Sequence, residues 1–135
     1  MAVLRNKKAK GTSGERDLVH KFWALNWACI RVAGSGSSRY PSPDILAGNG
    51  LRKVAVECKT TSKEKIYIEK KQIEGLQYFS GIFGTESYIA VKFPEEEWLF
   101  LSIDDLNESE KSYVIGRNHA ISKGFILDEL IGNFL

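Results

Sequence analysis

The chain has 135 residues, of which 43% are hydrophobic and 27% charged, so we expect one globular domain with its own core and exclude a disordered chain. No apolar run approaches about 18 residues, and the basic N-terminus lacks the apolar stretch of a signal peptide, which argues against a membrane protein. We therefore expect a cytoplasmic protein in which Cys29 and Cys58 remain reduced core residues.

The net charge of +2 is unevenly distributed along the chain. Residues 95–110 contain seven of the 17 acids and none of the 19 Lys and Arg residues. The rest of the chain sets 19 bases against ten acids, a net charge of +9. Such an excess favours a polyanionic partner such as nucleic acid, and we expect the acidic segment to face away from it.

Residues 1–13 are basic, contain no acid and include Gly11, so we predict a mobile N-terminal arm. The arm either wraps a nucleic-acid backbone or only solubilises the terminus, and the sequence leaves both readings open. The bases that would contact nucleic acid are Arg5, Lys7, Lys8 and Lys10.

A helix is predicted to follow the arm, with Thr12 or Ser13 as its N-cap and an apolar stripe that ends near Leu25. Glu15 lies in its first turn, where a carboxylate complements the helix dipole. The helix dipole alone therefore accounts for an acidic residue at position 15, and no functional site is needed to explain it.

A Gly- and Ser-rich loop, residues 34–40, follows a predicted strand at residues 29–33. Such a loop can approach phosphates through backbone N–H groups, but it lacks the G-x-x-x-x-G-K-[ST] pattern of a nucleotide-binding P-loop. A flexible surface loop is the alternative. Pro41 and Pro43 then stiffen the chain just before Asp44.

Two short apolar runs, residues 45–47 and 54–56, flank the turn sequence Gly-Asn-Gly at residues 48–50 and predict an antiparallel hairpin. Asp44 begins the first strand, and Glu57 ends the second. The hairpin should therefore bring these two carboxylates to the same end.

Side chains alternate across a strand, so Glu57 and Lys59 should share one face while Cys58 points into the opposite, apolar layer. Two carboxylates beside an amine suit a site that cuts phosphodiesters, because Mg²⁺ prefers hard oxygen ligands. A surface hairpin with solvated charges is the alternative on these residues alone.

The rest of the chain predicts an α/β fold with a central mixed sheet flanked by helices. Residues 66–68, 88–93 and 98–101 read as strands, and apolar residues at helical spacing predict a helix over 69–83. Residues 102–124 show no regular pattern.

The sequence Pro43-Asp44, followed by Glu57-Cys58-Lys59, matches the PD-(D/E)xK motif of restriction-endonuclease-like nucleases. The chain as a whole resembles the archaeal Holliday junction resolvases of the Hjc type, most clearly over residues 5–93. The further motifs that carry the resemblance are Ser13-Gly14-Glu15-Arg16, Arg31, Gly34-Ser35-Gly36, Lys65-Ile66-Tyr67-Ile68 and Gln72.

The resemblance implies a single nuclease domain with a restriction-endonuclease-like core, which forms a homodimer. The dimer would cut opposing strands of a four-way DNA junction with Mg²⁺, for which Mn²⁺ would substitute. Glu15, Asp44, Glu57 and the Cys58 carbonyl would hold the metal, and Lys59 would orient or help deprotonate the attacking water. Ser35 matches the active-site loop serine, and the further DNA contacts would be Arg16, Arg31, Arg39 and Gln72, with Arg31 alternatively a structural partner of the carboxylates.

Two surfaces for partners are also expected. Phe93, Trp98 and Phe100 either contact the second subunit or are ordinary core residues. The C-terminal tail, residues 128–135, either packs on the core or docks a partner. It resembles a sliding-clamp-binding box, with Asp in the usual Gln position, formed by Asp128, Ile131, Phe134 and Leu135.

Three other functions compete with junction resolution. The first is a restriction-like or repair endonuclease that cuts duplex or flap DNA on the same core. The second is a junction-binding scaffold without activity, against which a cluster of like charges with no cation to bind would be costly. The third is an RNA-binding module, which the absence of a stacked-aromatic signature disfavours.

Overall fold

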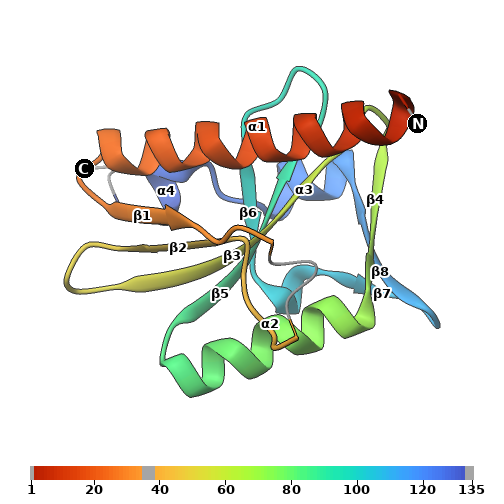
Figure 1. Ribbon diagram of the computed structural model, residues 1–135. Coiled ribbons are helices and arrows are strands. Elements are labelled where there is room, and N and C mark those ends of the chain that lie inside the picture. The colour runs from red at the N-terminus through yellow and green to blue at the C-terminus, as the bar shows by residue number, and fades with distance from the viewer. Residues whose placement is uncertain (1, 35–38, 133–135) are drawn as a thin grey trace.

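The computed structural model describes residues 2–34 and 39–132, with side chains from Gly11 onward. Its helices lie on either side of a central sheet, and a smaller sheet stands at one end (Figure 1). The helices are α1 (Ala2–Ala24), α2 (Lys70–Phe83), α3 (Arg117–Lys123) and α4 (Leu127–Leu130), with a 3₁₀ turn, η2 (Ile103–Asp105). The strands are β1 (Ala28–Arg31), β2 (Ile45–Gly48), β3 (Lys53–Thr60), β4 (Lys65–Glu69), β5 (Glu86–Lys92), β6 (Leu99–Leu101), β7 (Asn107–Glu108) and β8 (Ser112–Gly116).

The central sheet has the strand order β1-β2-β3-β5-β6 and is mixed, as predicted. Strands β1, β2 and β3 are antiparallel neighbours, β3 and β5 run parallel, and β6 is antiparallel to β5. The predicted hairpin is β2–β3, in which Ile45 pairs with Val56. The Asn49 side chain accepts hydrogen bonds from the backbone N–H groups of Leu51 and Arg52, and these bonds close the turn.

Helices α1 and α2 cover opposite faces of this sheet (Figure 1). Because side chains alternate along β3, Val54 and Val56 pack with Leu18 and Phe22 of α1, while Ala55 packs with α2. Two apolar cores therefore lie on either side of β3, the strand that carries Glu57 and Lys59.

Helix α1 is longer than the sequence indicated. It runs without interruption from Ala2, so the expected N-cap at Thr12 or Ser13 is wrong, and residues 2–13 are helical where a mobile arm was expected. Alanine, leucine, arginine and lysine are strong helix formers, and they outweigh the helix-weakening effect of Gly11 and Gly14.

Gly14 is required by packing rather than by flexibility. A Cβ atom at this position would lie 3.2 Å from Cζ2 of Trp98 and 3.5 Å from Cγ2 of Thr60. Glycine therefore lets α1 approach the sheet closely one residue before Glu15.

The segment expected to be irregular, residues 102–124, contains strands β7 and β8 and helix α3. With β4 these strands form a second sheet in the order β4-β8-β7, in which Ile66 pairs with Ile115. The acidic segment is partly neutralised there, because Glu96 lies 3.1 Å from Arg117 and Glu108 lies 3.0 Å from Lys70.

The proposed subunit contacts Phe93, Trp98 and Phe100 are 1%, 4% and 0% exposed, so they are core residues and the subunit-contact reading is wrong. They face the interior because β5 and β6 lie between helices that cover both faces of the sheet.

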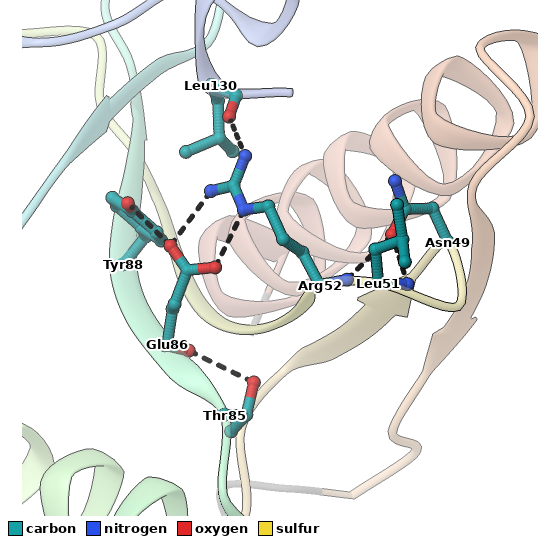
Figure 2. Close-up of polar contacts among 7 residues, drawn as sticks. All are labelled: Asn49, Leu51, Arg52, Thr85, Glu86, Tyr88 and Leu130. Carbon is teal, nitrogen blue, oxygen red and sulfur yellow. Dashed lines mark hydrogen bonds and ion pairs between the residues drawn. The ribbon is translucent and has the colours of Figure 1, made fainter. Parts of the chain in front are cut away.

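Helix α4 is tied to the hairpin by Arg52 (Figure 2). The guanidinium of Arg52 donates to both carboxylate oxygens of Glu86 at 2.8 Å and to the Leu130 carbonyl at 2.6 Å. It also lies 5.7 Å from the centre of the Trp27 ring, and the Tyr88 hydroxyl donates to Glu86. These contacts hold the last described helix against the sheet.

The C-terminal tail was expected either to pack on the core or to dock a partner, and its described residues are partly packed and partly exposed. Ile131 packs against the core around α1, whereas Asp128 is exposed. Phe134 and Leu135 lie outside the described residues. Within the described part of the chain, no helix has the length and apolar character needed to cross a membrane.

Candidate active site

Asp44 is fixed by the strands on both sides of it. Its carbonyl accepts from the Val32 N–H at 2.8 Å, and its own N–H donates to the Val56 carbonyl at 3.0 Å. Its side chain is 8% exposed, and Oδ2 accepts from the Cys58 N–H at 2.8 Å. The end of the hairpin therefore presents one carboxylate in a single orientation.

Glu57 and Lys59 share a face of β3, as the alternation predicted. The Lys59 ammonium lies 4.0 Å from Oε2 of Glu57, and both side chains are largely shielded from solvent. Cys58 points the other way and packs against the core beneath α1, where burial raises the pKa of its thiol. Its thiol is therefore a protonated core group, and the role of its carbonyl as a metal ligand remains a prediction.

Glu15 reaches this region from α1, on the other side of the sheet. Its carboxylate lies 3.2 Å from Nε of Arg31, at the end of β1, and the side chains of Glu15 and Arg31 are 18% and 25% exposed. Arg31 is thus the structural partner of a carboxylate, which was one of its two predicted roles. Its contact with DNA remains a prediction.

The three carboxylates influence one another electrostatically. Burial, and next the negative charge of Asp44, raise the pKa of Glu57 to about 8, against a smaller lowering by Lys59. Burial and Asp44 also raise the pKa of Glu15, while Arg31 and Lys59 act to lower it. The site concentrates negative charge that a cation would stabilise.

The donor chemistry fits a hard divalent cation, because carboxylate oxygens are the preferred ligands of Mg²⁺. The geometry fits it only in part. Among the described residues, no group of three or more His, Cys, Asp and Glu side chains is close enough to enclose an ion. Asp44 and Glu57 face each other, whereas Glu15 is engaged by Arg31.

A cavity of about 790 Å³, which we call the α2 pocket, opens beside Glu57 and extends along α2. It brings together two predicted DNA contacts, Arg39 and Gln72, with Tyr40 and Tyr78, which the sequence did not single out for DNA contact. Among the residues that line it are Arg39, Tyr40, Glu57, Lys71, Gln72 and Tyr78.

The other predicted site residues are less defined. Arg16 is exposed on α1, one position after Glu15. Ser35 lies outside the described residues, as do the side chains of Arg5, Lys7, Lys8 and Lys10, although these four positions belong to α1.

Sequence reasoning missed Tyr40 and Tyr78 of the α2 pocket. The available signal was the spacing of Lys71, Gly75 and Tyr78, which places them on one face of a helix. Nothing in the sequence indicated that the loop before Asp44 would lie against that face.

Comparison with known proteins places this arrangement in a family. The model of the family described as archaeal Holliday junction resolvase (Hjc) matches residues 6–134. The chain is 39% identical over 127 residues to the crossover junction endodeoxyribonuclease Hjc of Archaeoglobus fulgidus, covering 94% of this chain and 93% of that protein. It is 42% identical over 130 residues to the Methanocaldococcus jannaschii protein of the same name, covering 96% and 92%.

The solved structure of Archaeoglobus fulgidus Hjc, described as a Holliday junction resolvase from an archaeal hyperthermophile, has the same fold. It superposes with a TM-score of 0.85 at 36% identity, over 93% of this chain and 98% of that one. The α/β fold with its mixed sheet is thereby confirmed. The chain belongs to the archaeal Holliday junction resolvase (Hjc) family.

Proposed function

We propose that this chain is a structure-selective endonuclease, which resolves four-way DNA junctions by hydrolysing a phosphodiester in each of two opposing strands. The observation that carries the proposal is the convergence of Asp44, Glu57 and Lys59 at the end of a buried hairpin, in a chain of the Hjc family. The names of its relatives, crossover junction endodeoxyribonuclease, describe the same chemistry.

The reaction would depend on Mg²⁺, with Mn²⁺ as a substitute. Asp44 and Glu57 would hold the ion, together with Glu15 and the Cys58 carbonyl. When bound, the cation would polarise the scissile phosphate and offset the negative charge that builds on it. Burial first, and then the nearby charge of Asp44, raise the pKa of both Glu15 and Glu57, and a bound cation would offset both effects by stabilising the charged carboxylates.

The protein's own groups would orient the reactants. Lys59, held 4.0 Å from Glu57, would position the attacking water or assist its deprotonation. Arg16, Arg39 and Gln72 would hold phosphates of the DNA backbone on either side of the cut. The basic residues Arg5, Lys7, Lys8 and Lys10 at the start of α1 would contact further phosphates. Such contacts carry no base readout, which suits an enzyme that selects shape over sequence.

We also infer a homodimer, because two opposed strands require two sites. Because Phe93, Trp98 and Phe100 are buried in the core, we propose instead an exposed apolar surface at the C-terminal end of α2 for the contact. There Ile82 is 73% exposed and Phe83 is 49% exposed.

One experiment separates the candidate functions. Purified protein is incubated with Mg²⁺ and a synthetic immobile four-way junction, a matched duplex or a flap. Paired symmetric nicks on the junction alone support the proposal. Equal cutting of the duplex or flap would favour a restriction-like or repair endonuclease, and tight binding without cutting would favour a scaffold.

Asp44→Asn and Glu57→Gln should each abolish cutting while junction binding persists, because they remove a metal-binding charge and leave the surface unchanged. Glu110→Gln, at an exposed position of the acidic segment, is the control and should cut normally. Retained cutting in either site variant would overturn the site assignment.

We further propose that the tail binds a sliding clamp through Asp128, Ile131, Phe134 and Leu135. Because Ile131 packs on the core, this binding would require the end of α4 to detach. Calorimetry with an archaeal clamp tests it, and equal affinity after deletion of residues 128–135 would remove the proposal.

A further inference from the structure

We propose that the α2 pocket holds an unstacked base of the cut strand, next to the scissile phosphate, with Tyr40 and Tyr78 as its stacking surfaces. This inference rests on the proposed function and adds a base-binding subsite to it. The pocket of about 790 Å³ includes Glu57 in its wall, so whatever it holds lies adjacent to the reacting phosphate. Its size is in the range of sites that enclose small organic ligands.

The two tyrosines are the reason to expect a base. Tyr40 is 71% exposed and Tyr78 is 64% exposed, although both line the same cavity. Single exposed aromatic residues need no explanation, but two that share a cavity with a catalytic carboxylate do. The Arg39 guanidinium lies 5.9 Å from the centre of the Tyr40 ring, and this pairing of a cation with a ring is common where nucleic-acid bases stack.

The loop and the helix are built to approach each other here. Lys71, Gly75 and Tyr78 form one face of α2. A Cβ atom at Gly75 would lie 3.6 Å from Cβ of Pro41, so the loop that carries Tyr40 runs directly along this face. The two rings therefore belong to one pocket, although they come from segments far apart in the sequence.

The charges of the pocket favour a base over a row of phosphates. Arg39 and Lys71 contribute positive charge, but Glu69 and Glu74 line the same cavity and would repel phosphate. Carboxylates accept hydrogen bonds from the exocyclic amines of bases, which phosphates do not offer. Phosphates would then lie toward Arg39, and the base would enter between the tyrosines.

A base subsite would also contribute to junction selectivity. Extracting a base from the stack costs least where duplex stacking is already interrupted, and strands leave one helix for another at the branch point. In a continuous duplex the same extraction would cost more. The pocket would thus favour the branched substrate without reading its sequence.

The test combines protein and DNA changes. The cut sites on an immobile junction are mapped first, and abasic sites are then placed at each nucleotide that flanks the cut. Tyr40→Ala and Tyr78→Ala should each lower kcat/KM on the intact junction by roughly 5- to 100-fold, whereas the Phe variants should keep most of the activity. At one of the flanking positions, the abasic site should lower the kcat/KM of the wild-type protein by a similar factor. On that abasic junction, the Tyr40→Ala and Tyr78→Ala variants should have a kcat/KM close to that of the wild type, because the base they would stack against is already missing.

Tyr67→Ala is the matched control, because Tyr67 is 65% exposed on β4 and does not line the pocket. It should cut both substrates like the wild type. If the Ala variants, relative to the wild type, lose as much activity on every abasic junction as on the intact one, the base subsite is overturned. Junction cutting by the wild type would still support the proposed function in that case. A wild type that cuts no junction would overturn both.

Discussion

At the scale of the residue, Glu57 is a carboxyl group whose proton affinity rises strongly on folding. Its pKa rises from an ordinary value of 4.5 to about 8, first because it is buried and second because Asp44 is close. Between about pH 4.5 and 8, the folded protein therefore keeps a proton on the Glu57 carboxyl, whereas the unfolded chain has released it. The free energy of unfolding then falls as pH rises between about 4.5 and 8, and the whole penalty is present above pH 8.

Glu57→Gln should consequently stabilise the metal-free protein at alkaline pH. Glutamine is neutral at every pH, so in EDTA at about pH 8.5 we expect a gain on the order of 1–3 kcal/mol, which should shrink toward zero near pH 4. Thermal unfolding followed by circular dichroism measures this difference. Glu110→Gln, at an exposed position, should change stability little at either pH. A gain for Glu57→Gln that is the same at both pH values would refute the charge explanation.

Residue-level prediction from the sequence succeeded where the relation was local. Strand alternation correctly placed Glu57 and Lys59 together and Cys58 in the core, because only neighbouring residues are involved. Glu15 could be assigned to the site only through the family resemblance. Its distance from Asp44 depends on how α1 lies on a sheet that later residues form. Tyr78 was missed because the loop that packs beside it comes from a distant segment.

At the scale of the element, α1 positions Glu15 through its contact at Gly14. The start of this helix was mispredicted because Gly11 and Gly14 read as flexible linker residues, whereas Gly14 meets Trp98 from a distant strand. The second sheet was missed for a related reason: β7 and β8 are short and lie among charged residues, so no periodic pattern marks them.

The two glycines of α1 give a matched pair of variants. Gly14→Leu should lower the free energy of unfolding by about 1–3 kcal/mol and reduce junction cutting, because the side chain would overlap Trp98 and push Glu15 away. Gly11→Leu should stabilise the helix by up to about 1 kcal/mol and leave cutting intact, since nothing lies within 4 Å of a Cβ there. Denaturant unfolding and a cleavage time course measure both effects. Equal behaviour of the two variants would show that Gly14 has no packing role.

At the scale of the whole molecule, the exposed end of α2 is the surface through which we propose that two copies of the chain pair. Ile82 follows Tyr78 by one helical turn, so the proposed subunit contact and the α2 pocket lie on the same side of the helix. Two pockets would then open toward the symmetry axis of a dimer, where the strands of a junction exchange.

Ile82→Glu should convert the protein to a monomer, because burying a charge in an apolar contact is strongly unfavourable. Analytical ultracentrifugation measures the change in mass. Junction cutting should fall, and any remaining cuts should occur independently on the two strands instead of together. Ile121→Glu is the control, since Ile121 is 47% exposed on α3, and it should remain a dimer. A dimeric Ile82→Glu variant would place the subunit contact elsewhere.

The pairing of β2 with β3 also bears on the order in which the site forms during folding. Asp44 and Glu57 meet by closing a short hairpin loop, whereas the parallel pairing of β3 with β5 and the docking of α1 close much longer loops. Because short loops close faster, we expect Asp44 and Glu57 to meet before the groups that shield them are in place. On this basis we expect Asp44 and Glu57 to become neighbours at an early stage of folding, and Glu15 and the residues of α2 to join them only as the domain is completed.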